Sequence, residues 1–152
     1  MHTWSTRLAE LGHTLPDAAA PVAAYVPAVR TGNLVYTSGQ LPLIDGVLQH
    51  AGKVGDTVQP DEAAIAARTC TLNALAAIDR LVGLDSIERI VKVVGFVASA
   101  DGFTGQPAVI NGASTLLTEI FEEAGAHARS AVGVAELPLD TPVEVELIVE
   151  VG

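Results

Sequence analysis

Apolar and polar residues alternate most regularly at the end of the chain, over residues 143–151. The apolar side chains there are Val143, Val145, Leu147 and Val149, and those between them are Glu144, Glu146, Ile148 and Glu150. Because successive side chains of a β-strand point to opposite faces of a sheet, this alternation predicts a strand with one apolar face and one largely acidic face.

Residues 87–98 predict a second long strand of a different kind. β-Branched residues are frequent, and apolar side chains such as Val93, Val94 and Phe96 fall on both faces. This pattern is typical of a central strand that is covered on both sides. Shorter apolar runs predict strands over residues 25–29, 34–38, 41–48 and 130–135, the first two joined as a hairpin through residues 30–33 and the third broken by a tight turn at Asp45-Gly46.

Apolar residues recur every three or four positions over residues 60–82 and 107–124, which predicts two helices. A glycine follows each segment and is suited to end the helix. A shorter helix, capped by Ser5, is expected over residues 5–11.

The elements follow one another in the order β-β-(β)-α-β-α-β-β. This order predicts an α+β sandwich with one mixed sheet and two main helices on one face. An N-terminal arm with a short helix is expected over residues 1–21 and a single domain over residues 22–152. The other face of the sheet needs a cover, and in a chain of 152 residues the simplest cover is another copy of the same chain.

The composition supports self-association and excludes some partners. Hydrophobic residues make up 49% of the chain but aromatic residues only 4%, so the core must consist of Ala, Val, Leu and Ile. Charged residues, at 17%, are fewer than the usual fraction of roughly 25%, which leaves apolar surface for a subunit interface. The net charge of -10, with scattered basic residues, argues against nucleic acid and anionic membranes as partners.

Several kinds of site are not expected. Cys70 is the only cysteine and falls in a predicted helix, where a buried thiol acts as a small hydrophobe. His2, His13, His50 and His127 have no partner at metal-ligand spacing, so no metal site is predicted. The chain has no phosphate loop, no signal peptide and no membrane-spanning apolar run, and a cytoplasmic location is the simplest expectation.

A few polar residues stand in apolar surroundings. Arg129 lies between a Gly/Ala-rich turn and a predicted strand, where an arginine is either solvated, salt-bridged or a two-pronged clamp on a carboxylate. Glu144 and Glu146 share one face of the last strand. They are either ordinary charges of a sheet face, or a pair that binds a cation or raises the pKa of one carboxyl group, which then orients a water.

Three stretches of sequence carry a family resemblance. The first reads Tyr25-Val-Pro-Ala-Val, and the second reads Gly32-Asn-Leu-Val-Tyr-Thr-Ser-Gly-Gln-Leu-Pro42. The third reads Ala128-Arg-Ser-Ala-Val-Gly-Val-Ala-Glu-Leu-Pro138 and is followed by Val143-Glu-Val-Glu146. In order, spacing and content they resemble the RidA/YjgF (reactive intermediate deaminase) family, and the resemblance extends over residues 22–151, with Asn73 and Val91-Lys-Val adding to it.

The resemblance implies a chorismate-mutase-like α+β fold that forms homotrimers with ligand sites between subunits. Members of the deaminase branch hydrolyse enamines or imines to 2-oxo acids and ammonia without a cofactor. By this resemblance Arg129 binds the substrate carboxylate and Glu144 lies beside the attacking water. Further positions that match the family's substrate pocket are Tyr25, Ser38, Gly39 and Asn111.

Some positions depart from the family pattern. Pro27 replaces a polar residue, Ala131 replaces Cys or Thr, and His127 replaces a proline; the N-terminal arm is also longer than in compact members. These changes predict a reshaped pocket.

Several functions compete for this chain. The leading interpretation is an enamine or imine deaminase, and the alternative is a non-catalytic trimer that binds small carboxylates as a sensor or partner protein. A related hydrolase acting on aminoacrylate-type products of pyrimidine breakdown also fits. Ribonuclease activity, described for some family members, fits poorly with an acidic chain that has no basic groove.

Overall fold

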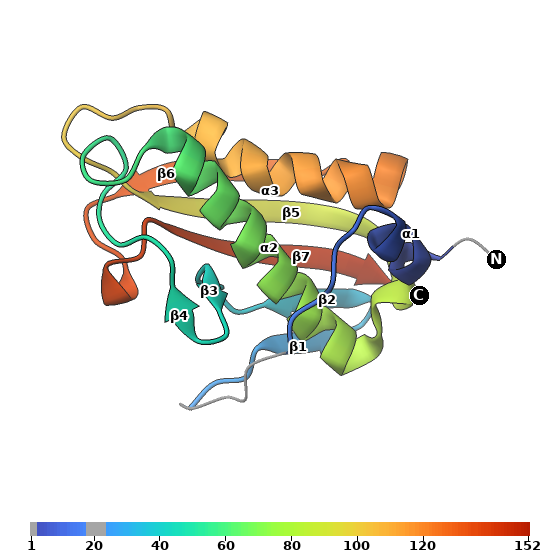
Figure 1. Ribbon diagram of the computed structural model, residues 1–152. Helices are drawn as coiled ribbons and strands as arrows, with labels where there is room; N and C mark the ends of the chain where they lie inside the picture. The colour runs from blue at the N-terminus through green and yellow to red at the C-terminus, as the bar shows by residue number, and fades with distance from the viewer. Residues whose placement is uncertain (1–2, 18–23) are drawn as a thin grey trace.

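A five-stranded mixed sheet forms the centre of the molecule in the computed structural model, which describes residues 3–17 and 24–152 (Figure 1). The strand order is β1-β2-β7-β5-β6, and β5 and β6 run parallel while the other neighbours are antiparallel. The bounds are Ala28–Thr31 for β1, Leu34–Thr37 for β2, Ile87–Ala98 for β5, Ala128–Val134 for β6 and Val143–Val151 for β7.

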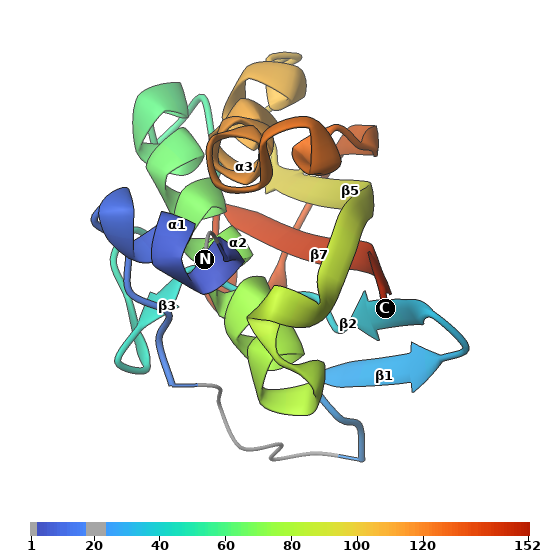
Figure 2. The same ribbon diagram turned by 90° about the vertical axis from the view of Figure 1, so that its right-hand side faces the viewer.

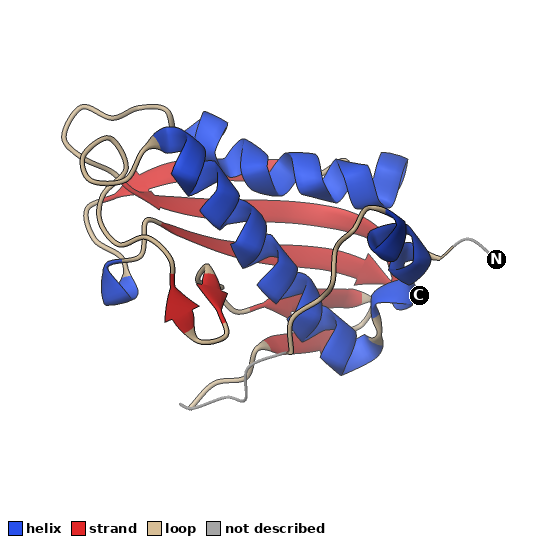
Figure 3. Ribbon diagram, viewed as in Figure 1, coloured by secondary structure: helices blue, strands red, loops and turns tan. Residues whose placement is uncertain are grey.

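Two helices cover one face of this sheet, and no helix of the described residues lies on the other, bare face (Figures 2 and 3). They are α2, Pro60–Val82, and α3, Gln106–Phe121. A Cβ atom at Gly112 of α3 would collide with the backbone carbonyl of Ala64 in α2, so this glycine lets the two helices approach closely. The predicted α+β architecture, with one mixed sheet and two main helices on one face, is therefore confirmed.

The core lies between the helices and the inner face of the sheet. Val143, Val145, Leu147, Val149 and Val151 of β7 are all buried there, as the alternation in the sequence predicts. The predicted bounds of β5, β7 and α2 agree with the structure.

β5 differs from its prediction in two respects. Register shifts between Ile87 and Arg89 and between Ile90 and Lys92 change which side chains share a face, so that Ile90 and Val93 both point into the core. The strand lies inside the sheet, but among the described residues helices cover only its inner face, and Val94 and Phe96 lie on the other face.

Other predicted bounds need correction. α3 ends at Phe121 rather than residue 124, because Glu122 adopts a left-handed φ of 54° and starts the short 3-10 helix η2, Glu122–Gly125. β1 begins at Ala28 rather than Tyr25, so Tyr25 lies in the segment before the strand.

The shorter elements lie around the sheet. β3, Leu43–Ile44, and β4, Val47–Leu48, form a separate hairpin whose turn at Asp45 and Gly46 has positive φ at both residues. The 3-10 helices η1, Leu84–Ser86, and η3, Pro138–Asp140, precede β5 and β7. No helix among the described residues is long and apolar enough to span a membrane.

The first helix, α1, Trp4–Glu10, packs against the domain. Thr3 caps it, and not Ser5 as predicted, because the Ser5 hydroxyl instead donates to the Asp85 carboxylate at 2.6 Å. The Trp4 indole contacts the ring of Phe121 edge-to-face and donates to the carbonyl of Ile87 at 2.7 Å. The predicted boundary between residues 21 and 22 lies outside the described residues.

Candidate active site

Arg129 lies on β6 and its side chain faces α3. Its strand partner is Val93, which is fully buried beneath the helices, so Arg129 is on the inner face of the sheet. The guanidinium Nη1 donates to the Asn111 Oδ1 atom at 2.7 Å and to the Ser114 Oγ atom at 3.3 Å. The structure therefore brings together Arg129 and Asn111, two of the residues predicted for the site.

A histidine extends this cluster. His127 Nδ1 lies 2.6 Å from the carbonyl oxygen of Gly125, and its Nε2 lies 2.8 Å from Ser114 Oγ. Because a carbonyl oxygen only accepts, Nδ1 carries the hydrogen and Nε2 of the neutral ring accepts from the Ser114 hydroxyl. The sequence interpretation missed both Ser114 and His127. Ser114 follows Asn111 by three residues on one helix, a spacing that already predicts a shared face.

Glu144 lies on the opposite, bare face of the sheet. It is paired with Phe96 across β5 and β7 and has Glu146 two residues along the same face. Burial, and secondarily the negative charge of Glu146, raises the pKa of the Glu144 carboxyl above its usual value. A carboxyl group with a raised pKa is suited to accepting and returning a proton near neutral pH.

The loop after β2 shapes the surroundings of Glu144. A Cβ atom at Gly39 would collide with the Glu144 carboxylate in its present position, so glycine lets this side chain lie directly against the loop. The Ser38 hydroxyl donates to the Val26 carbonyl at 2.7 Å, and Asn73 on α2 donates to the carbonyls of the same loop at Leu41 and Leu43. The structure therefore places Gly39 against Glu144, and Ser38 is the preceding residue of the same loop.

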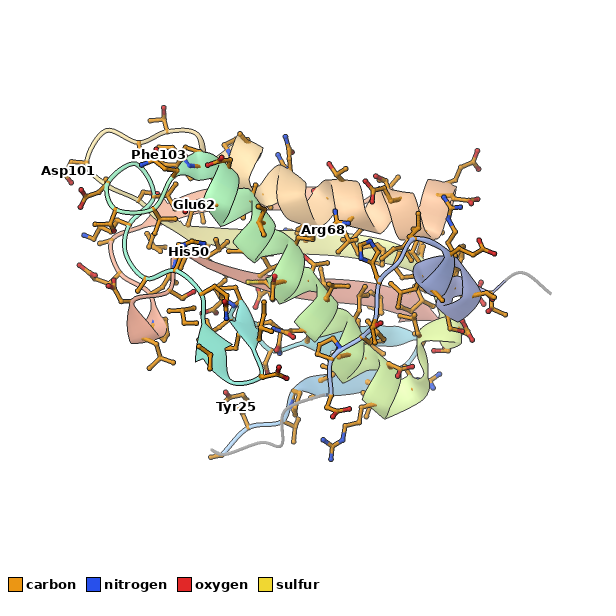
Figure 4. The ribbon with its side chains drawn as sticks, in the orientation of Figure 1. Tyr25, His50, Glu62, Arg68, Asp101 and Phe103 are labelled. Atoms are coloured by element: carbon orange, nitrogen blue, oxygen red, sulfur yellow. The ribbon has the colours of Figure 1, made fainter. Side chains whose placement is uncertain are left out.

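Tyr25 is 59% exposed and lies at the rim of the molecule, before β1 (Figure 4). No hydrogen bond of its hydroxyl group is found within the described residues. The described residues therefore give this side chain no hydrogen-bond partner.

The predicted residues form two groups that a single chain does not bring together. Arg129 and Asn111 are on the helix side of the sheet, whereas Glu144, Ser38 and Gly39 are associated with its bare side. β6 and β7 are separated by β5, which corresponds to roughly 10 Å across the sheet. Arg129 therefore has Asn111 and Ser114 as partners in the chain, and Glu144 cannot share a small ligand with it there.

Two other features lie apart from these groups. A cavity of about 230 Å³ lies between α2 and the β3–β4 hairpin, and its polar lining includes His50 and Glu62, whose closest nitrogen and oxygen are 3.5 Å apart (Figure 4). Cys70 is fully buried, and burial raises the pKa of its thiol well above the usual value, so it is a packing residue and not a reactive thiolate. Residues 3–17 and 24–152 contain no cluster of three or more His, Cys, Asp or Glu side chains that could hold a metal ion.

Comparison with known proteins agrees with the fold. A family model described as "YjgF/chorismate_mutase-like, putative endoribonuclease" matches residues 5–151. Protein TCP17 of Trypanosoma cruzi is 43% identical over 150 residues, which cover 97% of this chain and 94% of that protein. The crystal structure of Atu1372, an Agrobacterium tumefaciens protein of unknown function, has a TM-score of 0.90 at 45% identity and covers 98% of this chain and 92% of that one.

A relative with a named activity is also similar. The 2-iminobutanoate/2-iminopropanoate deaminase of Escherichia coli strain K12 is 35% identical over 133 residues, which cover 87% of this chain and 91% of that protein. The fold is thus that of the chorismate-mutase-like α+β proteins. Within this class, the chain belongs to the RidA/YjgF family.

Proposed function

We propose that this protein is a cofactor-free deaminase that hydrolyses 2-imino acids and their enamine tautomers to 2-oxo acids and ammonia. Arg129 binds the substrate carboxylate and Glu144 orients the attacking water. Support comes from the site geometry and from the similarity to an enzyme that is named as a 2-iminobutanoate/2-iminopropanoate deaminase.

The proposal includes a homotrimer in which each site is formed between two subunits. The observation that carries it is the placement of Arg129 and Glu144 on opposite faces of one sheet. One substrate can contact both only if Arg129 and Asn111 come from one copy and Glu144, Ser38 and Gly39 from another. Tyr25, exposed at the rim of the chain, is proposed to complete the pocket in this assembly.

The chemistry needs only these groups. The imine carbon is electrophilic, so the protein must hold the carboxylate and direct one water at that carbon. As the water oxygen bonds to the carbon, Glu144 takes a proton from the water and returns it to the nitrogen. The hydroxyl of this intermediate then passes its proton, again through Glu144, to the nitrogen as the carbon–nitrogen bond breaks, which releases ammonia and leaves the 2-oxo acid.

The shared site is tested by mixing two inactive variants. Arg129→Ala and Glu144→Gln are refolded separately and together, and 2-oxo acid release from imines generated in situ is measured above the spontaneous rate. In a cyclic trimer made from equal amounts of both variants, roughly a quarter of the sites combine two intact residues, so about a quarter of the wild-type activity should return. If the mixture is as inactive as its components, the two residues do not act across a subunit boundary.

The clamp itself is tested by Arg129→Lys. Lysine keeps the positive charge but loses the planar pair of donors, so the value of kcat/KM should still fall about ten- to a hundredfold, and Arg129→Ala should abolish turnover. Sedimentation confirms that both variants keep the wild-type assembly. Near-normal turnover by Arg129→Ala would exclude the clamp, whereas carboxylate binding without turnover in the wild type would favour a non-catalytic binding protein.

A further inference from the structure

We propose that Ser114 and His127 are positioning residues that fix the guanidinium of Arg129 and determine which of its edges receives a carboxylate. The identity of the ligand rests on the proposed function, whereas the hydrogen-bond geometry around Arg129 is independent of it. It concerns two residues that the reaction itself does not use.

The first step is the count of donors on Arg129. Nη1 has two hydrogens, and the structure gives it two acceptors, Asn111 Oδ1 and Ser114 Oγ. Nε and Nη2 have no acceptor within the described residues. A guanidinium binds a carboxylate through two parallel N–H groups, either from Nη1 and Nη2 or from Nε and Nη2. Since Nη1 is occupied, the Nε–Nη2 edge is the one left for the ligand.

The second step is the direction of the hydrogen bonds behind Ser114. The hydroxyl of Ser114 must accept from Arg129, so its own hydrogen needs another acceptor. His127 Nε2, 2.8 Å away, is that acceptor. The hydrogen of the neutral ring is on Nδ1, which donates it to the Gly125 carbonyl, so Nε2 is free to accept. The chain of bonds therefore runs in one direction, from Arg129 through Ser114 and His127 to Gly125.

The third step is the rigidity of the end of that chain. Gly125 is buried against α3, and a Cβ atom there would collide with the backbone carbonyl of Leu117. The carbonyl that orients His127 thus belongs to a backbone segment packed directly on the helix that carries Asn111 and Ser114. Arg129 is held by groups from one packed unit, and a fixed donor pair loses less entropy when a ligand binds.

The experiment measures the guanidinium directly and separately from catalysis. Arg129 is one of six arginines, and its side-chain nitrogen signals in an NMR spectrum are assigned by their loss in Arg129→Lys. Hindered rotation should give separate Nη1 and Nη2 signals in the wild type. Ser114→Ala and His127→Phe should merge them, while Ser114→Thr, which keeps the hydroxyl, should restore the separation.

Binding of 2-oxobutanoate, an unreactive carboxylate of the product class, provides the second readout. Ser114→Ala and His127→Phe should each raise its Kd about tenfold, which corresponds to ~1.4 kcal/mol. The double variant should be no weaker than either single one, because both remove the same chain of bonds. In an Arg129→Lys background, Ser114→Ala should have no further effect. Thr115→Ala, which removes an exposed hydroxyl from the next position of α3, is the matched control and should bind like the wild type.

The outcomes separate this inference from the proposed function. Separate Nη signals and unchanged Kd values in Ser114→Ala and His127→Phe overturn the positioning role, whatever the turnover. Normal positioning and binding in a wild type that hydrolyses no imine overturn the deaminase but support the positioning role. Failure of the wild type to bind 2-oxobutanoate overturns the assignment of the Nε–Nη2 edge as a carboxylate site.

Discussion

Glu144 lies half-buried on β7, against Gly39 and on the same face as Glu146. Burial and the neighbouring carboxylate both disfavour its charged form, which raises its pKa. In the unfolded chain the group loses its proton near its ordinary pKa of 4.5, while the folded protein retains the proton to higher pH. The folded state therefore binds more protons in this interval, and its stability falls as pH rises through the raised pKa.

The Glu144→Gln variant should consequently be more stable than the wild type at pH 7 but catalytically impaired. Glutamine keeps the shape of the side chain and removes the charge that the folded state disfavours. Urea unfolding at pH 4 and pH 7 should give a stability advantage that is larger at pH 7. The same variant should lower kcat more than it raises KM, because the water and not the carboxylate clamp is affected.

Two neighbouring glutamates provide the comparison. Glu150→Gln removes a charge from the same face of β7 at a distance from Glu144 and should leave turnover unchanged. Glu146→Gln removes the like charge that raises the pKa of Glu144, so it should shift the acidic limb of the rate profile to lower pH and keep activity. A larger loss of kcat in Glu146→Gln than in Glu144→Gln would reverse the assigned roles.

At the level of elements, the sequence predicts those whose signal is local. The bounds of β7 and α2 follow from a regular alternation and a regular helical repeat, and both agree with the structure. Gly125 predicts that α3 ends at residue 124, but the helix ends at Phe121 because Glu122 adopts a positive φ. Backbone geometry of this kind depends on packing, and the spacing of apolar residues along the sequence does not predict it.

The candidate site is less predictable than the elements. The resemblance supplied Arg129 and Glu144, but a list of residues does not tell on which side of the sheet each lies. That follows from strand order and from the bulges in β5, which come from pairing between distant segments. The sequence shows no metal-ligand partner for His127, and its contact with Ser114 depends on how the turn before β6 packs on α3.

The segment after α1 is attached to α2 by a contact that depends on pH. Arg68 Nη2 donates to Nε2 of His13 at 2.8 Å, which requires the neutral imidazole. Burial, and then the positive charge of Arg68, lowers the pKa of His13, while Glu119 has the opposite effect. As pH falls, His13 takes up a proton in the unfolded chain near its ordinary pKa of 6.5, before it does so in the folded protein. The free energy of unfolding therefore decreases as pH falls from about 6.5 through the lowered pKa of His13.

The His13→Gln variant should therefore lose less stability in mild acid than the wild type. The glutamine oxygen can accept from Arg68 without titrating. Urea midpoints measured at pH 7.5 and pH 5.5 should differ less in this variant than in the wild type. Equal acid sensitivity in His13→Gln and the wild type would contradict the role of this contact.

For the molecule as a whole, the main physical problem is the bare face of the sheet. Val29, Tyr36 and Val132 are between 42% and 51% exposed there, on three different strands. Val94, Phe96 and Ile148 lie between them and are only partly covered. Exposed apolar side chains of this kind are typical of a subunit interface, and on this face they alternate with charged residues that include Glu144 and Glu146. Assembly and activity should consequently be lost together when this face is changed.

The variant Tyr36→Asp tests this coupling. In a single chain Tyr36 is exposed, so the substitution should change the free energy of unfolding of the monomer by no more than ~0.5 kcal/mol. In the proposed trimer the new carboxylate would be buried without a partner, which is costly. Sedimentation at micromolar concentration should give about three times the chain mass of 15.6 kDa for the wild type and the mass of a monomer for the variant, with loss of imine hydrolysis.

Ile65→Asp is the control, since Ile65 is 67% exposed on α2, away from this face, and should leave both mass and turnover unchanged. A monomeric wild type, or a monomeric Tyr36→Asp variant with full activity, would show that the site does not need a second subunit.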